Sequence, residues 1–133
     1  MVEHYYDEKH ENMAVLVSPG YGSGWSTWSD CGIDLATDKR IIEFFMKNEE
    51  EIHKYKFDDF AYYDDEAADY YPSIVDEFSK FLESIGYDEG YLGGLCDLVI
   101  QWIPIGSMFY IHEYDGSEAI VILKENENYY IAK

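Results

Sequence analysis

Residues 18–30, SPGYGSGWSTWSD, alternate glycines with other residues and then place two tryptophans among hydroxyl side chains. Glycines allow a backbone to approach a ligand, consecutive N–H groups can bind an anion, and tryptophan rings can stack on a flat ligand. The spacing nevertheless fails the dinucleotide pattern G-x-G-x-x-G, the lysine-containing phosphate loop and the nucleophile elbow G-x-S-x-G. One interpretation is therefore a ligand site of another kind, built from Gly20, Gly22, Gly24, Trp25, Ser26, Thr27 and Trp28.

The alternative interpretation of this stretch is structural. The glycines would permit unusual φ values in a tight excursion from the preceding strand, and one or both tryptophans would fill the core. The sequence leaves both interpretations open.

A second candidate is the run FDDFAYYDDEAADYY at 57–71, which holds six acids, six aromatics and no base. Carboxylates can imitate the phosphates of nucleic acid, and the interspersed rings add apolar contact with a partner. The alternative is a solvated face whose tyrosine rings pack inward. An ordinary surface mixes charges of both signs, which slightly favours a partner-binding surface. Its residues are Asp58, Asp59, Tyr62, Tyr63, Asp64, Asp65, Glu66, Asp69, Tyr70 and Tyr71, supported by Asp76, Glu77, Asp88 and Glu89.

The remaining residues of reactive types form no recognisable catalytic or metal-binding pattern. Glu113, Asp115 and Glu118 surround a turn, but their spacing is not that of an EF-hand calcium loop. The four histidines, His4, His10, His53 and His112, are scattered, and Cys31 and Cys96 have neither C-x-x-C nor zinc-ligand spacing. We therefore expect no catalytic residues, no metal, no cofactor and no enzymatic activity. The two cysteines are expected to be buried free thiols, with a disulfide between them as the alternative.

The formal net charge of −19 is the dominant property of the 133-residue chain. Direct binding to nucleic acid or to an anionic membrane needs Lys and Arg, so the charge argues against both and favours a basic protein partner. A generally acidic proteome would also account for it. The acidic N-terminus resembles no signal or transit peptide, and no apolar run reaches the roughly 20 residues of a membrane span. We expect a cytoplasmic protein.

The elements that would position these residues are those of a single α+β domain over 1–133. An apolar run at 13–18 predicts a buried strand, and 1–12 a loose N-terminal arm. Apolar residues at helical spacing predict a helix from Thr37 or Asp38 to about 55 and another from Pro72 to Gly86. Alternation then predicts strands at 95–105, 107–114 and 117–123, with a fourth at 128–132 and a type I′ turn at Asp115–Gly116. The expected fold is two or three helices on a small antiparallel sheet with a C-terminal β-meander.

Two stretches, GYGSGWSTW near the start and WIPIGSMFYIHEYDGSE near the end, resemble small acidic proteins of tailed bacteriophages and prophages. The shared pattern is a GxGWSTW loop, an acidic helical middle and a terminal EYDGSE hairpin. The resemblance covers about half of the chain, and it implies no catalytic residue. It implies by analogy a role in binding host machinery, because several phage anti-defence proteins, anti-CRISPR proteins among them, are acidic mimics of nucleic acid.

The functional prediction is a non-enzymatic, phage-type protein that inhibits or sequesters a basic host protein, one that binds nucleic acid or acts in defence. It would do so by nucleic-acid mimicry through 57–71. One alternative is a small-ligand or nucleotide binder using the loop at 20–28. A second alternative is a structural phage protein that forms a homo-oligomer, and a third is a hydrolase or metal enzyme.

Overall fold

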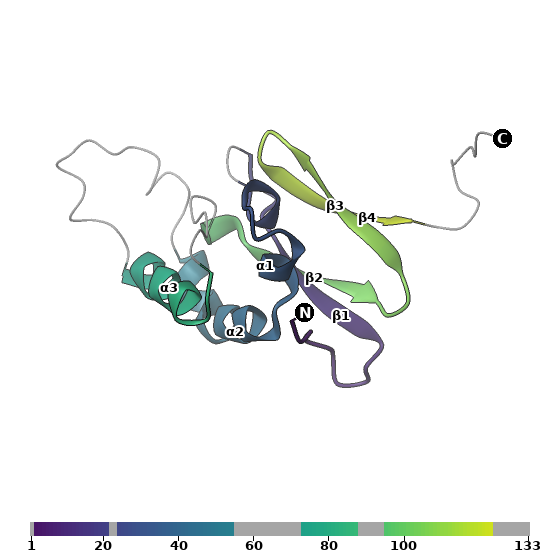
Figure 1. The fold of residues 1–133 in the computed structure, drawn as a ribbon, viewed down its shortest axis with the longest axis horizontal. Helices are drawn as coiled ribbons and strands as arrows, with labels where there is room; N and C mark the ends of the chain where they lie inside the picture. Colours follow the sequence, from purple (N-terminus) through teal and green to yellow (C-terminus); the bar gives the residue numbers. More distant parts are fainter. Residues whose placement is uncertain (1, 22–23, 55–72, 88–94, 124–133) are drawn as a thin grey trace.

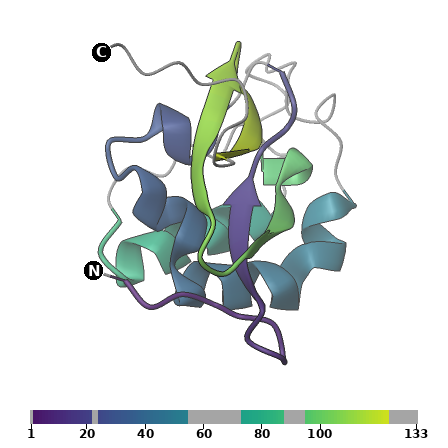
Figure 2. The same cartoon turned by 90° about the vertical axis from the view of Figure 1, so that its right-hand side faces the viewer.

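The computed structural model describes residues 2–21, 24–54, 73–87 and 95–123. Within these ranges the chain forms the expected α+β fold, with three α-helices and two antiparallel pairs of strands. One pair of strands, residues 12–17 and 99–104, lies between the helices and the other pair, which forms a protruding hairpin (Figure 1). In Figure 2, viewed from the hairpin side, the strands stand in front of the helices.

The central sheet pairs β1 (Asn12–Val17) with β2 (Val99–Pro104). The register runs antiparallel from Asn12 opposite Pro104 to Val17 opposite Val99. Both strands were expected, but the predicted meander would have paired β2 with the strand that follows it. The chain instead turns at Gly106, whose φ of 89° suits glycine, and β2 pairs with the first strand of the chain.

The second sheet is a hairpin of β3 (Met108–Tyr114) and β4 (Ser117–Leu123). Asp115 and Gly116 connect the strands with φ values of 49° and 84°. Two consecutive positive φ values define the type I′ turn predicted from the Asp-Gly dipeptide. The expected fourth strand at 128–132 lies outside the described residues.

The helices follow their predicted apolar stripes. Asp38 caps α2 (Lys39–His53) by accepting the backbone N–H of Arg40. Gly86, with a φ of 97°, follows the end of α3 (Ser73–Ser84) as the C-terminal glycine pattern predicts. Three shorter elements were not predicted from the sequence: η1 (Ser26–Trp28), α1 (Ile33–Thr37) and η4 (Leu95–Asp97).

The core lies on both faces of β1, which explains why this strand is apolar at every position from Ala14 to Val17. Ala14 and Leu16 face the helices, where Phe45 and Phe78 belong to the same cluster. Val15 and Val17 face the other way and belong to a second cluster with Ala36 and Ile103. The hairpin covers this second cluster with Phe109, Ile111 and Ile120.

The N-terminal segment is attached to the fold, whereas a loose arm was expected over residues 1–12. The Tyr5 carbonyl accepts the backbone N–H of Ala14 at 2.9 Å, and the Glu3 carbonyl accepts that of Lys39 at 2.8 Å. Tyr6 forms an isolated antiparallel bridge with Met13, and the Tyr5 ring packs against the core. Apart from the Tyr5 ring, these contacts are made by backbone groups, which hydropathy patterns do not reveal.

Candidate functional site

The glycine-tryptophan loop is held by a buried carboxylate from the opposite end of the chain. Glu118, at the start of β4, is 1% exposed. Its carboxylate accepts the backbone N–H groups of Ser18 at 2.9 Å, Trp25 at 2.9 Å and Thr27 at 3.0 Å, together with the Thr27 hydroxyl. The loop therefore does bind an anion through its backbone, as its composition suggested, but the anion is a side chain of the same protein.

The two tryptophans of the loop have different environments. Trp25 is 1% exposed and donates its indole N–H to the Leu35 carbonyl. Its ring packs edge to face on Phe78, with the two ring centroids 5.9 Å apart. Trp28 is 43% exposed and donates its indole N–H to Glu113 at 3.1 Å. One tryptophan thus belongs to the core, as the structural interpretation expected, and the other lies partly exposed beside the hairpin.

Two glycines of the loop serve close packing. A Cβ at Gly24 would lie 2.7 Å from the Trp28 ring, and one at Gly20 would collide with the Asp97 carboxylate. Neither glycine has a positive φ, in contrast to the unusual φ values that the structural interpretation expected. Gly22 and Ser23 lie outside the described residues.

Glu113 and Glu118 face each other across the hairpin as a cross-strand pair. Two carboxylates directly opposite each other repel unless each is compensated. Glu113 accepts hydrogen bonds from the backbone N–H of Gly116 and the Trp28 indole, and these hold the pKa of its carboxyl below the usual value. Both carboxylates are thus satisfied by the protein itself, and neither needs a cation.

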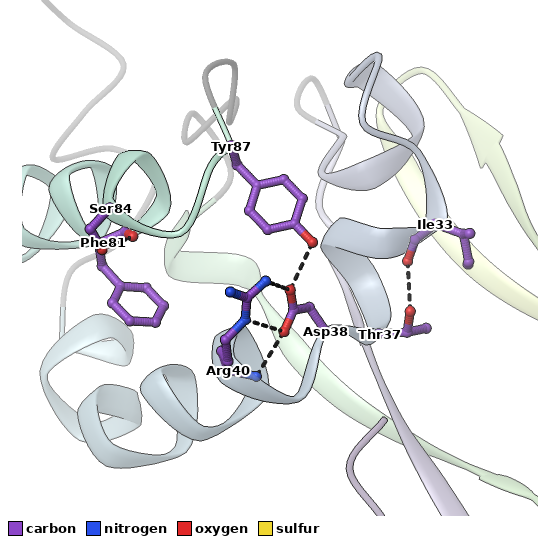
Figure 3. A network of polar contacts seen from close by, with 7 residues as sticks. All are labelled: Ile33, Thr37, Asp38, Arg40, Phe81, Ser84 and Tyr87. Carbon is purple, nitrogen blue, oxygen red and sulfur yellow. Dashed lines mark hydrogen bonds and ion pairs between the residues drawn. The ribbon is translucent and has the colours of Figure 1, made fainter. Parts of the chain in front are cut away.

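A second polar cluster joins the helices (Figure 3). Asp38, 1% exposed, accepts two hydrogen bonds from the Arg40 guanidinium and one from the Tyr87 hydroxyl at 2.8 Å. Burial alone would raise the pKa of Asp38, but the bonds from Arg40 and Tyr87 outweigh it and the pKa is lowered. Burial and the Asp38 charge raise the pKa of Tyr87 far above its usual value.

The two cations that follow the glycine-tryptophan loop in sequence, Lys39 and Arg40, are both engaged in ion pairs. Arg40 is paired with Asp38 at 2.7 Å, and Lys39 lies 3.8 Å from Glu43. A nucleotide bound at the loop would need a cation to balance its phosphates. These pairs leave the ligand-binding alternative with little charge to support it.

The residues proposed to contact a partner, 57–71, lie outside the described residues, as do Asp88 and Glu89. The described helices on either side in sequence carry acids on their exposed surfaces. The last two turns of α2 carry Glu49, Glu50 and Glu51, and the first turn of α3 carries Asp76 and Glu77. The acidic character of the run therefore continues into the helices that flank it.

The remaining histidines and cysteines have structural environments where they are described. His53 lies 2.6 Å from the Leu98 carbonyl and packs edge to face on Phe45. Cys31 and Cys96 are both half-buried, where buried thiols were expected. Among the described residues, no three side chains of the His, Cys, Asp or Glu type are grouped so as to hold a metal ion.

Comparison with known protein families, with curated proteins and with solved structures finds no match to this chain. No helix in the described part of the chain is long and apolar enough to cross a membrane.

Proposed function

We propose that this protein is a non-enzymatic binding protein of phage type that sequesters a basic, nucleic-acid-binding protein of the host cytoplasm by imitating nucleic acid. The observation that carries the proposal is the net charge of −19 combined with the base-free acidic-aromatic run at 57–71. Carboxylates spaced along such a run would take the places of phosphates in a basic channel, and the aromatic rings would add apolar contact.

The use of cations in the structure supports this proposal. Of the nine Lys and Arg residues, Lys39, Arg40 and Lys80 lie within 4 Å of a carboxylate on their own helix or at its cap. Each ion pair is neutral as a unit, so these three cations form no separate positive patch, and the long-range field that a partner meets has the sign of the net charge of −19.

The experiment is affinity capture from bacterial lysate with two charge variants. One variant carries lysine at Asp58, Asp59, Asp64, Asp65 and Asp69, and the control carries five lysines at exposed acids outside the proposed surface, Glu3, Glu8, Glu11, Glu43 and Glu83. Both variants change the net charge by the same amount. Capture of nucleic-acid-binding proteins by the wild type and the control, but not by the first variant, supports the proposal. Equal capture by all three proteins, or no such capture by the wild type, contradicts it.

The ligand-binding alternative keeps one supporting feature, the partly exposed indole of Trp28. A thermal-shift and tryptophan-fluorescence screen of nucleotides tests it, because a ligand stacked on Trp28 would change its emission. The homo-oligomer alternative draws on exposed aromatic side chains of β3, Tyr110 and Tyr114. Light scattering during size-exclusion chromatography measures the oligomeric state directly.

A further inference from the structure

We propose that the outer edge of β3 binds an extended, basic segment of a partner protein by adding it as a third strand to the hairpin. The proposal rests on the proposed function only in taking the partner to be basic. It places a contact on the described part of the molecule, away in sequence from 57–71. Four observations lead to it: the direction of the backbone groups, a groove, an unpaired hydroxyl and the local charge.

The backbone groups of Phe109, Ile111 and Glu113 point away from β4. A two-residue type I′ turn is closed by a hydrogen-bonded pair, here Tyr114 with Ser117, and pairs alternate along the ladder from there. A hydrogen bond on the outer side of β4 agrees with this alternation. Glu118, opposite Glu113, donates its N–H outward to the Ser18 carbonyl at 2.8 Å.

The two edges of the hairpin therefore differ. At the start of β4, the outward N–H of Glu118 binds the Ser18 carbonyl, and the Ser117 hydroxyl donates to the Pro19 carbonyl. In the described ranges, β3 pairs with β4 alone, and no backbone hydrogen bond is formed on the outer side of Phe109 or Ile111. An unpaired strand edge is a template for another strand.

A groove of about 450 Å³ runs beside this edge. Its walls are β3 on one side and the segment from η1 to the start of α1 on the other, and it is lined by Ser26, Thr27, Ser29, Gly32, Ile33, Phe109, Tyr110 and Ile111. Ser26 is 3% exposed, yet its hydroxyl has no hydrogen-bond partner among the described residues. A buried hydroxyl without a partner is costly, and a peptide in the groove would supply one.

The charge around the groove identifies the kind of segment that would enter it. Both chain segments that form its walls lie in long stretches without any Lys or Arg, residues 10–38 and 81–123. Asp30 and Asp34 lie in the first stretch beside the lining residues, and Glu113 and Asp115 lie in the second at the far end of β3. Edge strands are commonly protected from pairing by lysines, and β3 has none.

A second copy of the chain is a poorer occupant. Pairing β3 with itself would bring two groups of acids together in a protein that already carries −19. Like charges brought together in this way oppose association, whereas lysines on an added strand would meet complementary charge. Backbone hydrogen bonds would supply affinity, and alternate side chains would enter the groove.

The probe is a fluorescein-labelled peptide, Thr-Lys-Val-Lys-Val-Lys-Thr, measured by fluorescence anisotropy at low salt. Its control is the same sequence N-methylated at every interior amide, which keeps the charge and removes the donors that strand addition requires. We expect the methylated peptide to bind at least roughly tenfold more weakly. In amide hydrogen exchange, the parent peptide should protect Phe109 and Ile111, because their N–H groups face the added strand.

Two variants with matched chemistry locate the site. Ile33 lines the groove, Ile105 lies in the turn before β3, and each side chain is 50% exposed. Ile33→Lys should weaken the parent peptide by roughly tenfold, and Ile105→Lys by less than about twofold. Because both isoleucines are half exposed, neither lysine disturbs the core.

The outcomes separate this inference from the proposed function. Equal binding of both peptides, no binding of the parent peptide, or equal effects of the two lysine variants would overturn strand addition at β3. Protection of the β3 amides by dimerisation without peptide would assign the edge to a second copy and also overturn it. Loss of peptide binding only when 57–71 is charge-reversed would overturn this inference while leaving the proposed function in place.

Discussion

The Glu118 carboxylate lies 2.9 Å from the backbone nitrogen of Trp25, across 93 positions of sequence, and both residues are buried. This contact joins the end of the chain that forms the hairpin to the loop that follows the first strand. The same carboxylate also accepts N–H groups from Ser18 and Thr27. The Glu118 carboxylate therefore helps to fix the position of the hairpin, and with it the groove beside β3, together with the packing of the hairpin on the core.

Glu118→Gln should lower the free energy of unfolding by about 1.5–3 kcal/mol, because an amide loses the charge and turns a donor toward backbone donors. Urea denaturation followed by tryptophan fluorescence measures the effect. The matched control is Glu113→Gln at the opposite cross-strand position, where the side chain is exposed and the cost should be below about 1 kcal/mol. Equal costs for the two variants would contradict the role assigned to Glu118.

Gly24→Ala should lower the free energy of unfolding by about 1–3 kcal/mol, because its Cβ would lie 2.7 Å from the Trp28 ring. The ring must then move and lose its hydrogen bond to Glu113. A double-mutant cycle is the control, since the cost of Gly24→Ala should fall when Trp28 is already replaced by alanine. An unchanged cost in that background would show that Trp28 is not what the methyl group meets.

Asp38 should make the stability of the protein fall in acid. Its pKa is lowered in the folded state, so its contribution is present above the usual carboxyl pKa of about 3.9 and is lost as the pH falls through the folded-state pKa. Asp38→Asn keeps a residue that can cap α2 but should flatten the loss of stability below about pH 4. The measurement is urea unfolding from pH 7 to pH 2, and an identical slope in both proteins would rule out this contribution.

Tyr87 should act at the opposite end of the pH range. Its pKa is raised in the folded state, so its contribution is complete below the usual tyrosine pKa of about 10 and is lost as the pH rises above it. Tyr87→Phe should be less stable at neutral pH by about 0.5–1.5 kcal/mol, through loss of the bond to Asp38, and should lose less stability above pH 10. Parallel stability curves in alkali would contradict the assignment.

The longer elements of the fold were predictable because each has a local signal. The apolar stripe and Asp38 mark α2, Gly86 marks the end of α3, and Asp115–Gly116 marks the hairpin turn. The partner of β2 was not predictable, because strand alternation says which face is buried and not which strand lies alongside. The short helices were missed because three to five residues carry too little periodicity to detect.

The contacts that organise the site were harder to foresee, because a charged residue type suggests a surface. Glu118 can be buried because groups more than 90 positions away satisfy its carboxylate, and Asp38 because Arg40 and the distant Tyr87 satisfy its own. One signal pointed to Glu118: the alternation of β4 places it on the same face as Ile120, which packs toward the core. Tyr87 had no such signal, since it lies 49 positions from Asp38 in a loop.

The central claim is that this protein occupies a basic nucleic-acid site, and competition tests it most directly. A captured partner is purified, loaded with a fluorescent oligonucleotide and titrated with this protein at several salt concentrations. The account predicts that the oligonucleotide is displaced, that displacement weakens steeply as salt rises, and that the charge-reversed 57–71 variant does not displace it. Binding to the partner with the oligonucleotide still in place, at every salt concentration, would contradict the claim.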